Sequence, residues 1–250
     1  MKIGAQFYTI RNFCKTTEEL ERSIDKVADI GYKSIQLSGV CPYDAGVIGD
    51  KLKGLGMTVD LTHFDYRKIL NETDDVIAFH DRMNCKYIGI GVNPYGATPE
   101  GIEKLVGDLK AEVLPKLAAS GHKLMYHNHN FEFARFDGKL YLDMLCEAFP
   151  PELLGLTLDM YWVQAGGADP VEVIKKYSDY VRCVHLKDMV YDAGDRTIHM
   201  APVGAGNMNY PAILEACKEA DVEYAFVEQD DCYAEDPFDC LKQSFEYLTK

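Results

Sequence analysis

Residues 154–186 read LGLTLDMYWVQAGGADPVEVIKKYSDYVRCVHL, and this stretch contains one complete strand–helix–strand unit. The apolar run Leu154–Leu158 predicts a buried strand, and Asp169-Pro170 is a typical N-cap followed by the first residue of a helix. A second apolar run, Val181–Leu186, predicts the next strand. Two strands joined by a helix favour parallel pairing through a right-handed crossover. The unit therefore indicates an α/β protein with a parallel sheet.

The same alternation of strand and helix continues outward to both ends of the chain. Together with the two strands above, the expected strands are Lys2–Phe7, Ser34–Leu37, Thr58–Thr62, Tyr87–Gly91, Lys123–His127 and Tyr224–Val227. Eight such units with short links close naturally into a barrel. An open doubly wound sheet is the alternative, but it usually carries a glycine-rich first turn, whereas residues 6–11 read QFYTIR. We expect a single-domain (β/α)8 TIM barrel that spans residues 1–250.

Capping signals mark the expected helices. Thr17-Glu18-Glu19 reads as an N-cap with an acidic first turn, and Gly31 as the end of that helix. The second helix is expected to end near Gly56, and the third to begin at Asn71. The fourth runs from Thr98-Pro99-Glu100 to Gly121, and the fifth covers Tyr141–Ala148. The last three are expected to begin near Asp169-Pro170, Tyr210-Pro211 and Asp236-Pro237. The longest irregular segment, Lys187–Asn209, follows the seventh strand, and long loops in compact domains are usually functional or mobile.

Composition excludes several classes of partner. The chain has 26 Lys and Arg against 40 Asp and Glu, a formal charge of −14, and no run of basic residues, so nucleic acid is not an expected partner. No apolar run is long enough to span a bilayer. The 8 cysteines are widely spaced without a CxxC pair, and no secretion signal precedes the first strand. We expect reduced cysteines in a cytoplasmic protein.

Polar side chains end most of the expected strands. In a βα barrel these ends meet at one rim, where active sites form. The rim residues are Gln6 and Tyr8, His63, His127 with His129 and Glu132, Asp159 with Trp162, His185 with Lys187, and Glu228. Strands five to eight each bring an acid or a histidine, and converging carboxylates would repel one another without a cation. Oxygen and imidazole ligands favour Mn²⁺ first, with Mg²⁺, Co²⁺ and Zn²⁺ as alternatives. We expect one divalent metal ion.

Each candidate also has a structural interpretation. Asp159 leaves a buried strand and points to the barrel mouth or caps a helix, whereas a lone His185 inside a strand would be a hydrogen-bonded core residue. Glu228 could instead cap a helix. Trp162 packs over a sugar face or belongs to the core, and Lys187 stabilises charge or pairs with Asp188.

The remaining candidates divide into ligands and substrate contacts. His127, His129 and Glu132 each lie within reach of a metal, and at least two of them are expected to contact ligands or substrate instead. Gln6, Tyr8, His63 and Trp162 are expected to bind substrate.

A glycine pair, Gly204 and Gly206, precedes the seventh helix, where barrels often bind phosphate on a helix N-terminus. No basic residue follows the pair, and turn geometry explains it equally well. Three further histidines, His80, His122 and His199, fall away from the rim and are interpreted as structural.

Several motifs resemble one known family. Residues 4–11 (GAQFYTIR), 185–188 (HLKD), 203–206 (VGAG) and 227–228 (VE) resemble the first, seventh and eighth strands of the xylose isomerase-like TIM barrels, the sugar phosphate isomerase/epimerase family. The likeness covers essentially the whole chain. Residues 126–129 (YHNH) and 159–162 (DMYW) resemble a subgroup linked to keto-sugar and inositol chemistry, which includes inosose dehydratase-like and 3-keto-glycoside cleaving enzymes.

The resemblance implies a ligand set. The family typically binds a divalent metal through Glu, Asp, His and Glu from the last four strands, and Asp159, His185 and Glu228 match the last three. Where family members place the first glutamate, this chain has His127. Glu132, five residues later, is the expected replacement, and His127 itself is the alternative.

These residues predict an enzyme that abstracts a proton beside a carbonyl. We expect a sugar isomerase or epimerase in which Glu228, Glu132, His127 or His129 moves the proton and Lys187 stabilises charge. Loss of a group β to the carbonyl would make it a lyase or dehydratase acting on a keto-sugar, keto-glycoside or inosose. An endonuclease IV-like enzyme and a non-catalytic sugar-binding barrel are further alternatives. Barrels of this kind often pair, so a homo-oligomer is left open.

Overall fold

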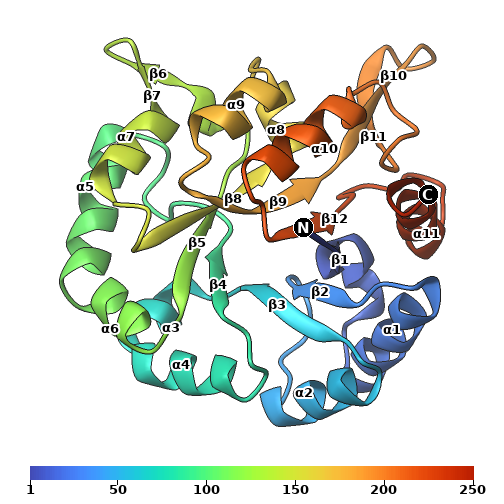
Figure 1. Ribbon diagram of the computed structural model, residues 1–250, viewed down its shortest axis with the longest axis horizontal. Helices are drawn as coiled ribbons and strands as arrows, with labels where there is room; N and C mark the ends of the chain where they lie inside the picture. The colour runs from blue at the N-terminus through green and yellow to red at the C-terminus, as the bar shows by residue number, and fades with distance from the viewer.

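The computed structural model describes residues 1–250 and contains a closed barrel of eight parallel strands (Figure 1). Each strand pairs with the next one along the chain, and β1 closes the barrel by pairing with both β2 and β12. The barrel strands are β1 (Lys2–Gln6), β2 (Ser34–Leu37), β3 (Thr58–His63), β4 (Tyr87–Ile90), β5 (Lys123–His127), β8 (Leu154–Asp159), β9 (Val181–Leu186) and β12 (Tyr224–Val227). The predicted (β/α)8 barrel is confirmed.

Helices surround the barrel on its outside, as Figure 1 shows. They are α1 (Thr17–Ile30), α2 (Ala45–Gly54), α3 (Tyr66–Asn71), α4 (Thr73–Asp81), α5 (Pro99–Asp108), α6 (Leu114–Ala119), α7 (Tyr141–Ala148), α8 (Met160–Ala165), α9 (Pro170–Lys176), α10 (Tyr210–Glu219) and α11 (Pro237–Leu248). A π-helical turn, Leu109–Val113, joins α5 to α6, and short 3₁₀ helices cover Phe7–Phe13 and Phe131–Phe133. None of the helices has the length and apolar character needed to cross a membrane.

The helix ends follow the capping signals with small shifts. The N-cap of α1 is Thr16 rather than the expected Thr17, and its side chain exchanges hydrogen bonds with Glu19 in a capping box. Gly31 ends this helix with φ +121°, a backbone angle that favours glycine. The expected helix start at Asn71 was wrong, because Asp65 caps an earlier helix, α3, and α4 begins at Thr73.

Two antiparallel hairpins interrupt the βα pattern. The segment expected to be irregular contains β10 (Asp188–Asp192) and β11 (Thr197–Ala201), and a shorter hairpin pairs β6 (Arg135–Phe136) with β7 (Lys139–Leu140). Both are mostly half-buried or exposed, so they lack the apolar runs by which the barrel strands were recognised.

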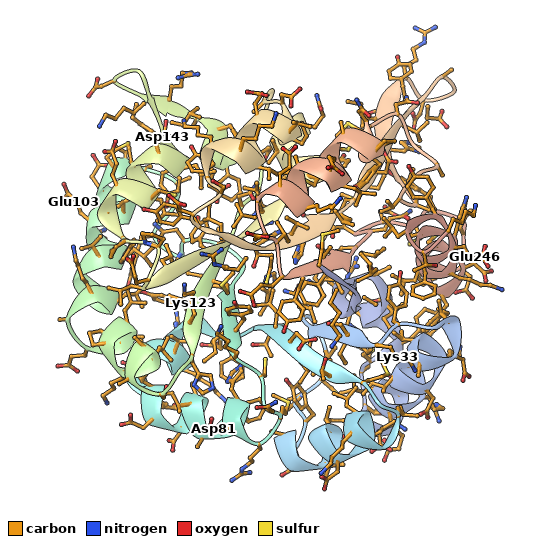
Figure 2. The ribbon with its side chains drawn as sticks, viewed as in Figure 1. Lys33, Asp81, Glu103, Lys123, Asp143 and Glu246 are labelled. Carbon is orange, nitrogen blue, oxygen red and sulfur yellow. The ribbon has the colours of Figure 1, made fainter.

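The barrel interior is filled at one level by five buried side chains that contact one another, which are Leu61, Tyr87, Met125, Cys183 and Phe226. A second and larger apolar cluster packs the strands against the helices. Side chains fill the space between strands and helices, as Figure 2 shows, and the cavity described below opens at the carboxyl ends of the strands.

Candidate metal centre and active site

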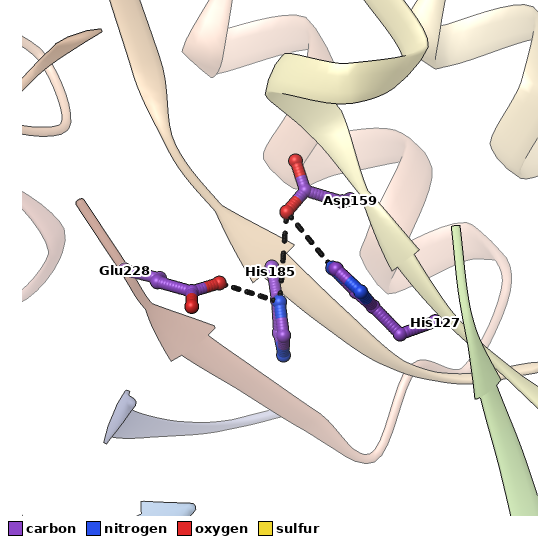
Figure 3. A group of neighbouring side chains, drawn as sticks. All are labelled: His127, Asp159, His185 and Glu228. Atoms are coloured by element: carbon purple, nitrogen blue, oxygen red, sulfur yellow. Dashed lines mark hydrogen bonds and ion pairs between the residues drawn. The ribbon is translucent and has the colours of Figure 1, made fainter. Parts of the chain in front are cut away.

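Four buried side chains converge above this inner layer (Figure 3). They are His127 at the end of β5, Asp159 at the end of β8, His185 in β9 and Glu228 directly after β12. One ligand atom from each lies within 4.8 Å of the ligand atoms of the other three. The strands are neighbours in the barrel, so residues at their carboxyl ends meet.

The pleat of the strands explains why these positions point inward. His127, His185 and Glu228 each lie two residues beyond a member of the inner apolar layer. Side chains two apart on a strand share a face, so they form the next layer toward the barrel mouth. Two residues beyond His127, His185 and Glu228 are His129, Lys187 and Asp230, and all three line the cavity at the barrel mouth.

His185 is held so that one ring nitrogen faces its neighbours. Its Nε2 donates to the side-chain oxygen of Gln36, 2.7 Å away, so Nδ1 is the ring nitrogen that faces the cluster. That Nδ1 lies 2.8 Å from Glu228 Oε2 and 3.5 Å from Asp159 Oδ2, without hydrogen-bond geometry. Although burial disfavours the imidazolium, the two carboxylates raise the pKa of His185.

His127 is oriented in the same way. Its Nδ1 faces the carbonyl oxygen of Gly91 at 3.4 Å, and its Nε2 lies 3.2 Å from Asp159 Oδ2. Burial and the neighbouring His185 lower the pKa of His127, so its ring is neutral near pH 7. A neutral ring whose outer nitrogen bonds the backbone is the usual form of a metal-binding histidine.

Asp159 caps a helix and also points into the cluster. One carboxylate oxygen accepts the Trp162 backbone N–H at 3.0 Å and caps α8, while the other, Oδ2, points into the cluster. The side chain of Asn128 accepts the backbone N–H of Asp159 at 2.9 Å and holds the strand end in place. Burial opposes ionisation, but Lys187 and the histidines hold the pKa of Asp159 well below its ordinary value.

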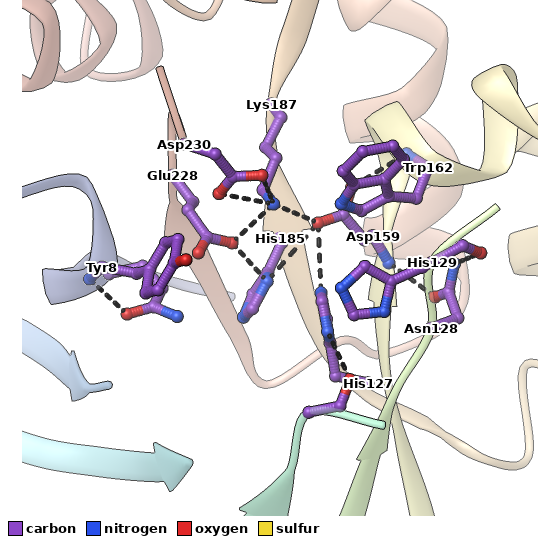
Figure 4. Close-up of polar contacts among 12 residues, drawn as sticks. Tyr8, His127, Asn128, His129, Asp159, Trp162, His185, Lys187, Glu228 and Asp230 are labelled. Carbon is purple, nitrogen blue, oxygen red and sulfur yellow. Dashed lines mark hydrogen bonds and ion pairs between the residues drawn. The ribbon is translucent and has the colours of Figure 1, made fainter. Parts of the chain in front are cut away.

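A lysine lies against the same carboxylates (Figure 4). Lys187 Nζ is 3.0 Å from Asp159 Oδ2 and 2.9 Å from Glu228 Oε2. It also lies 3.1 and 3.0 Å from the two oxygens of Asp230. Burial disfavours the ammonium, but the three carboxylates raise the pKa of Lys187. Lys187 therefore pairs with Asp230 and the cluster, not with Asp188.

The donor set fits a divalent metal ion. Two imidazole nitrogens and two carboxylate oxygens converge. His185 Nδ1 and Glu228 Oε2 are buried without a hydrogen-bond partner, although Glu228 Oε2 forms an ion pair with Lys187 Nζ. Mixed nitrogen and oxygen ligands suit Mn²⁺, Co²⁺ or Zn²⁺.

Glu132, the expected fifth-strand ligand, lies outside this cluster. Its two oxygens accept the Tyr126 hydroxyl and the His129 backbone N–H, each at 2.8 Å. Burial raises the pKa of Glu132 to about 7. The structure brings His127 to the position for which Glu132 was expected, because Glu132 lies in the 3₁₀ turn beyond β5 and faces Tyr126.

A cavity of about 400 Å³ opens above the cluster. Its wall is formed by Tyr8, Arg11, Ser38, His63, Gly91, Val92, His127, His129, Trp162, Lys187, Glu228 and Asp230. Tyr8, His63 and Trp162 thus lie where substrate contacts were expected. Gln6 does not line the cavity, since it is buried and its side-chain oxygen accepts the Tyr8 N–H.

The glycine loop is already filled by a side chain. The buried Asp188 carboxylate accepts the backbone N–H groups of Gly204, Gly206 and Met208 at 3.0–3.1 Å, and that of Met189 at 2.8 Å. A Cβ at Gly206 would collide with the Asp188 side chain. The amides that could have bound a phosphate are therefore used internally.

Four residues of the site were given no functional role from the sequence, although Asn128 and Asp230 lie at expected strand ends. Gln36, Asn128, Arg11 and Asp230 orient or border the cluster. The spacing of two residues from Phe226 to Glu228 and Asp230 was a signal for Asp230. Gln36 could have been noticed as an amide inside the buried strand Ser34–Leu37.

Comparison with known proteins agrees with the fold. Residues 24–250 match the family described as xylose isomerase-like TIM barrel. The chain is 38% identical over 196 residues to an inosose dehydratase of Geobacillus kaustophilus, and 28% identical over 192 residues to one of Clostridium perfringens. These matches cover 69% and 68% of this chain, but only 63% of the length of each relative.

A solved structure shows the same architecture. The sugar phosphate isomerase/epimerase of Parabacteroides distasonis superposes with a TM-score of 0.81 at 22% identity, over 100% of this chain and 98% of that one. At this identity the likeness extends to the fold alone.

Proposed function

The chain belongs to the xylose isomerase-like TIM barrels, and on this premise we propose that it is a divalent-metal-dependent dehydratase acting on a keto-sugar or an inosose-type cyclic ketone. The observation that carries the proposal is the convergence of His127, Asp159, His185 and Glu228 beneath a cavity large enough for one sugar ring. The dehydratase relatives support this reaction more than the isomerisation that we expected first, because the isomerase/epimerase likeness carries only the fold.

The four converging side chains would hold the ion, which when bound supplies a Lewis acid for the substrate's oxygens. His129 is the base that we favour. It lines the cavity, and burial lowers its pKa to about 4, so it is neutral near pH 7. Its ring stacks on Phe131 at 5.1 Å between centroids, which fixes its direction.

The elimination balances without another reactant. His129 takes the proton from the carbon beside the carbonyl, and the electron pair of that C–H bond forms a carbon–carbon double bond. The C–O bond on the next carbon breaks, and the hydroxyl leaves as water with the proton that His129 received. The Lys187 ammonium faces the same cavity and stabilises negative charge as it develops on the substrate.

Return of the proton to carbon, instead of loss of the hydroxyl, would give the isomerase or epimerase. The test is to load the purified protein with Mn²⁺ and incubate it with a panel of inososes and keto-sugars in heavy water. A product lighter by one water supports the dehydratase. A deuterated product of unchanged composition would indicate an isomerase or epimerase instead of a dehydratase. If no metal-loaded sample exchanges hydrogen with the solvent, the proposal is overturned.

We also propose a substrate without a phosphate group. The loop that could have bound phosphate is filled by Asp188, and three carboxylates of the site face the cavity or its floor. The test is a binding experiment in which a sugar and its phosphate ester compete for the site. Tighter binding of the phosphate ester would contradict this part of the proposal.

The remaining assignments follow from the same interpretation. We propose that residues 1–250 form one domain, that its partner is a small sugar and not nucleic acid, and that the protein is cytoplasmic, which its eight free cysteines support. Analytical ultracentrifugation would decide whether the protein forms a homo-oligomer.

A further inference from the structure

The Lys187 side chain lies where it would compete with a metal ion for the same carboxylate oxygens. Its Nζ lies within 3.0 Å of Asp159 Oδ2 and Glu228 Oε2, the oxygens that face the two histidines (Figure 4). An ion held by these residues would bind the same two oxygens. It would then share them with the ammonium, and two cations that share their ligands repel each other strongly in a buried site. The ammonium and a divalent ion therefore compete for the same pair of oxygens.

A second acceptor for the ammonium is already in place. Both oxygens of Asp230 lie 3.0–3.1 Å from Lys187 Nζ, on the side toward the mouth. The backbone of Asp230 is tied down, because its carbonyl accepts Arg11 Nη1 at 3.0 Å and its N–H donates to the sulfur of Met200 at 3.2 Å. Lys187 can thus leave two carboxylates and keep the third.

The charges of the site match this exchange. When all three are ionised, the carboxylates of Asp159, Glu228 and Asp230 carry three negative charges against the one positive charge of Lys187. Without an ion, burial and the neighbouring Glu228 raise the pKa of Asp230 to about 7. The two negative charges that Lys187 leaves unbalanced would be neutralised by one divalent ion. After the exchange the ion would pair with Asp159 and Glu228, and the ammonium with Asp230, so no buried charge would be left alone.

We propose that Lys187 is a resident cation of this site, that a divalent ion displaces it from Asp159 and Glu228, and that Asp230 receives the displaced ammonium. This inference rests on the metal centre of the proposed function and assigns Asp230 as a positioning residue for metal uptake. Lys187 sets the affinity for the ion by competing with it, and Asp230 limits that competition.

The test is a double-mutant cycle read by Mn²⁺ binding, with calorimetry on the full-length metal-free protein. Lys187→Met removes the competitor at similar length and is expected to tighten Mn²⁺ binding at least tenfold, about 1.4 kcal/mol. Asp230→Asn removes the acceptor and is expected to weaken binding roughly 10–100-fold, as loss of a group beyond the ligands does. In the Lys187→Met background, Asp230→Asn is expected to have almost no effect.

Asp231→Asn is the matched control, because Asp231 is the exposed neighbour of Asp230 and makes no contact with Lys187. It removes the same charge and is expected to leave Mn²⁺ affinity nearly unchanged. If Lys187→Met does not fold, the comparison of Asp230→Asn with Asp231→Asn still tests the inference. Equal effects on Mn²⁺ affinity would mean that Asp230 acts only through its charge at a distance and not as the acceptor of Lys187.

Two results would overturn the inference alone: unchanged or weaker Mn²⁺ binding by Lys187→Met, or an equal loss from Asp230→Asn in both backgrounds. If neither the wild-type protein nor any variant binds a divalent ion, the proposed metal centre itself fails. The two failures are therefore distinguishable.

Discussion

The Nε2 of His185 on β9 donates a hydrogen bond to the side-chain oxygen of Gln36 on β2, across the interior of the barrel. Both side chains are fully buried. This bond selects the ring form whose Nδ1 faces Glu228 and Asp159. A residue far from the cluster in sequence thus decides which nitrogen is available to a metal.

Replacement of Gln36 should therefore weaken metal binding. Gln36→Leu removes the acceptor, and we expect Mn²⁺ affinity to fall roughly 10–100-fold and stability to fall by about 1–3 kcal/mol, because the imidazole N–H is left buried without a partner. Titration calorimetry and urea unfolding measure the two effects. Gln36→Glu keeps an acceptor and is the control. Unchanged affinity in the leucine variant would contradict this role.

Metal loading should raise the melting temperature. An ion that binds only the folded chain stabilises it by about 2.7 kcal/mol at 100 times its Kd, which is roughly 5–10 °C for a chain of this size. Thermal unfolding with Mn²⁺ and with a chelator gives the comparison. The shift should vanish in Asp159→Asn, which loses one ligand charge. Equal shifts in both proteins would place the ion elsewhere.

Stability should fall as the pH rises through the range in which Glu132 titrates. Burial raises its pKa from 4.5 to about 7 in the folded chain, so between these values the unfolded chain binds fewer protons and unfolding becomes easier as the pH increases. The loss relative to Glu132→Gln should approach about 3 kcal/mol above pH 7.

Urea unfolding of both proteins at pH 5 and pH 8 measures this difference. The glutamine variant should also retain Mn²⁺ binding, because Glu132 lies outside the metal cluster. Parallel pH profiles of the two proteins, or loss of the metal in the variant, would contradict the structural role.

His129 should affect the chemical step and not the metal. His129→Gln is expected to lower kcat by about 10²–10⁴, the usual contribution of a general base, with Mn²⁺ affinity little changed. Turnover of the substrate found in the panel, followed beside a Mn²⁺ titration, measures both. His199→Gln is the control, since His199 lies on the β11 hairpin and does not line the cavity. Undiminished kcat in His129→Gln would exclude it as the base.

The Asp188 carboxylate should be a strong contributor to stability. It accepts four backbone N–H groups, and in Asp188→Asn an amide donor would face some of them. We expect a loss of about 3 kcal/mol in the free energy of unfolding, measured in urea. Asp192→Asn is the comparison and should cost less, because the half-buried Asp192 carboxylate accepts only two backbone N–H groups in the turn of the same hairpin. Similar stability of Asp188→Asn and the wild-type protein would mean that the loop does not depend on this carboxylate.

The sequence by itself determined the barrel fold and the end of the barrel at which the polar site residues gather. Apolar runs that alternate with capped helices are local signals, and eight repeats leave few arrangements other than closure. Asp159, His185 and Glu228 were expected together because strand ends converge in such a barrel, and the structure brings them together.

Only the tertiary structure decided how the site is completed. His127 and Glu132 are both plausible from the chain, but the pleat turns His127 inward while Tyr126 and the His129 amide bind Glu132. Gln36 meets His185, and Lys187 meets Asp230, because closure of the barrel brings distant strands within hydrogen-bond distance. Local periodicity determines which way a side chain points, whereas the partner it finds depends on the packing of the whole barrel.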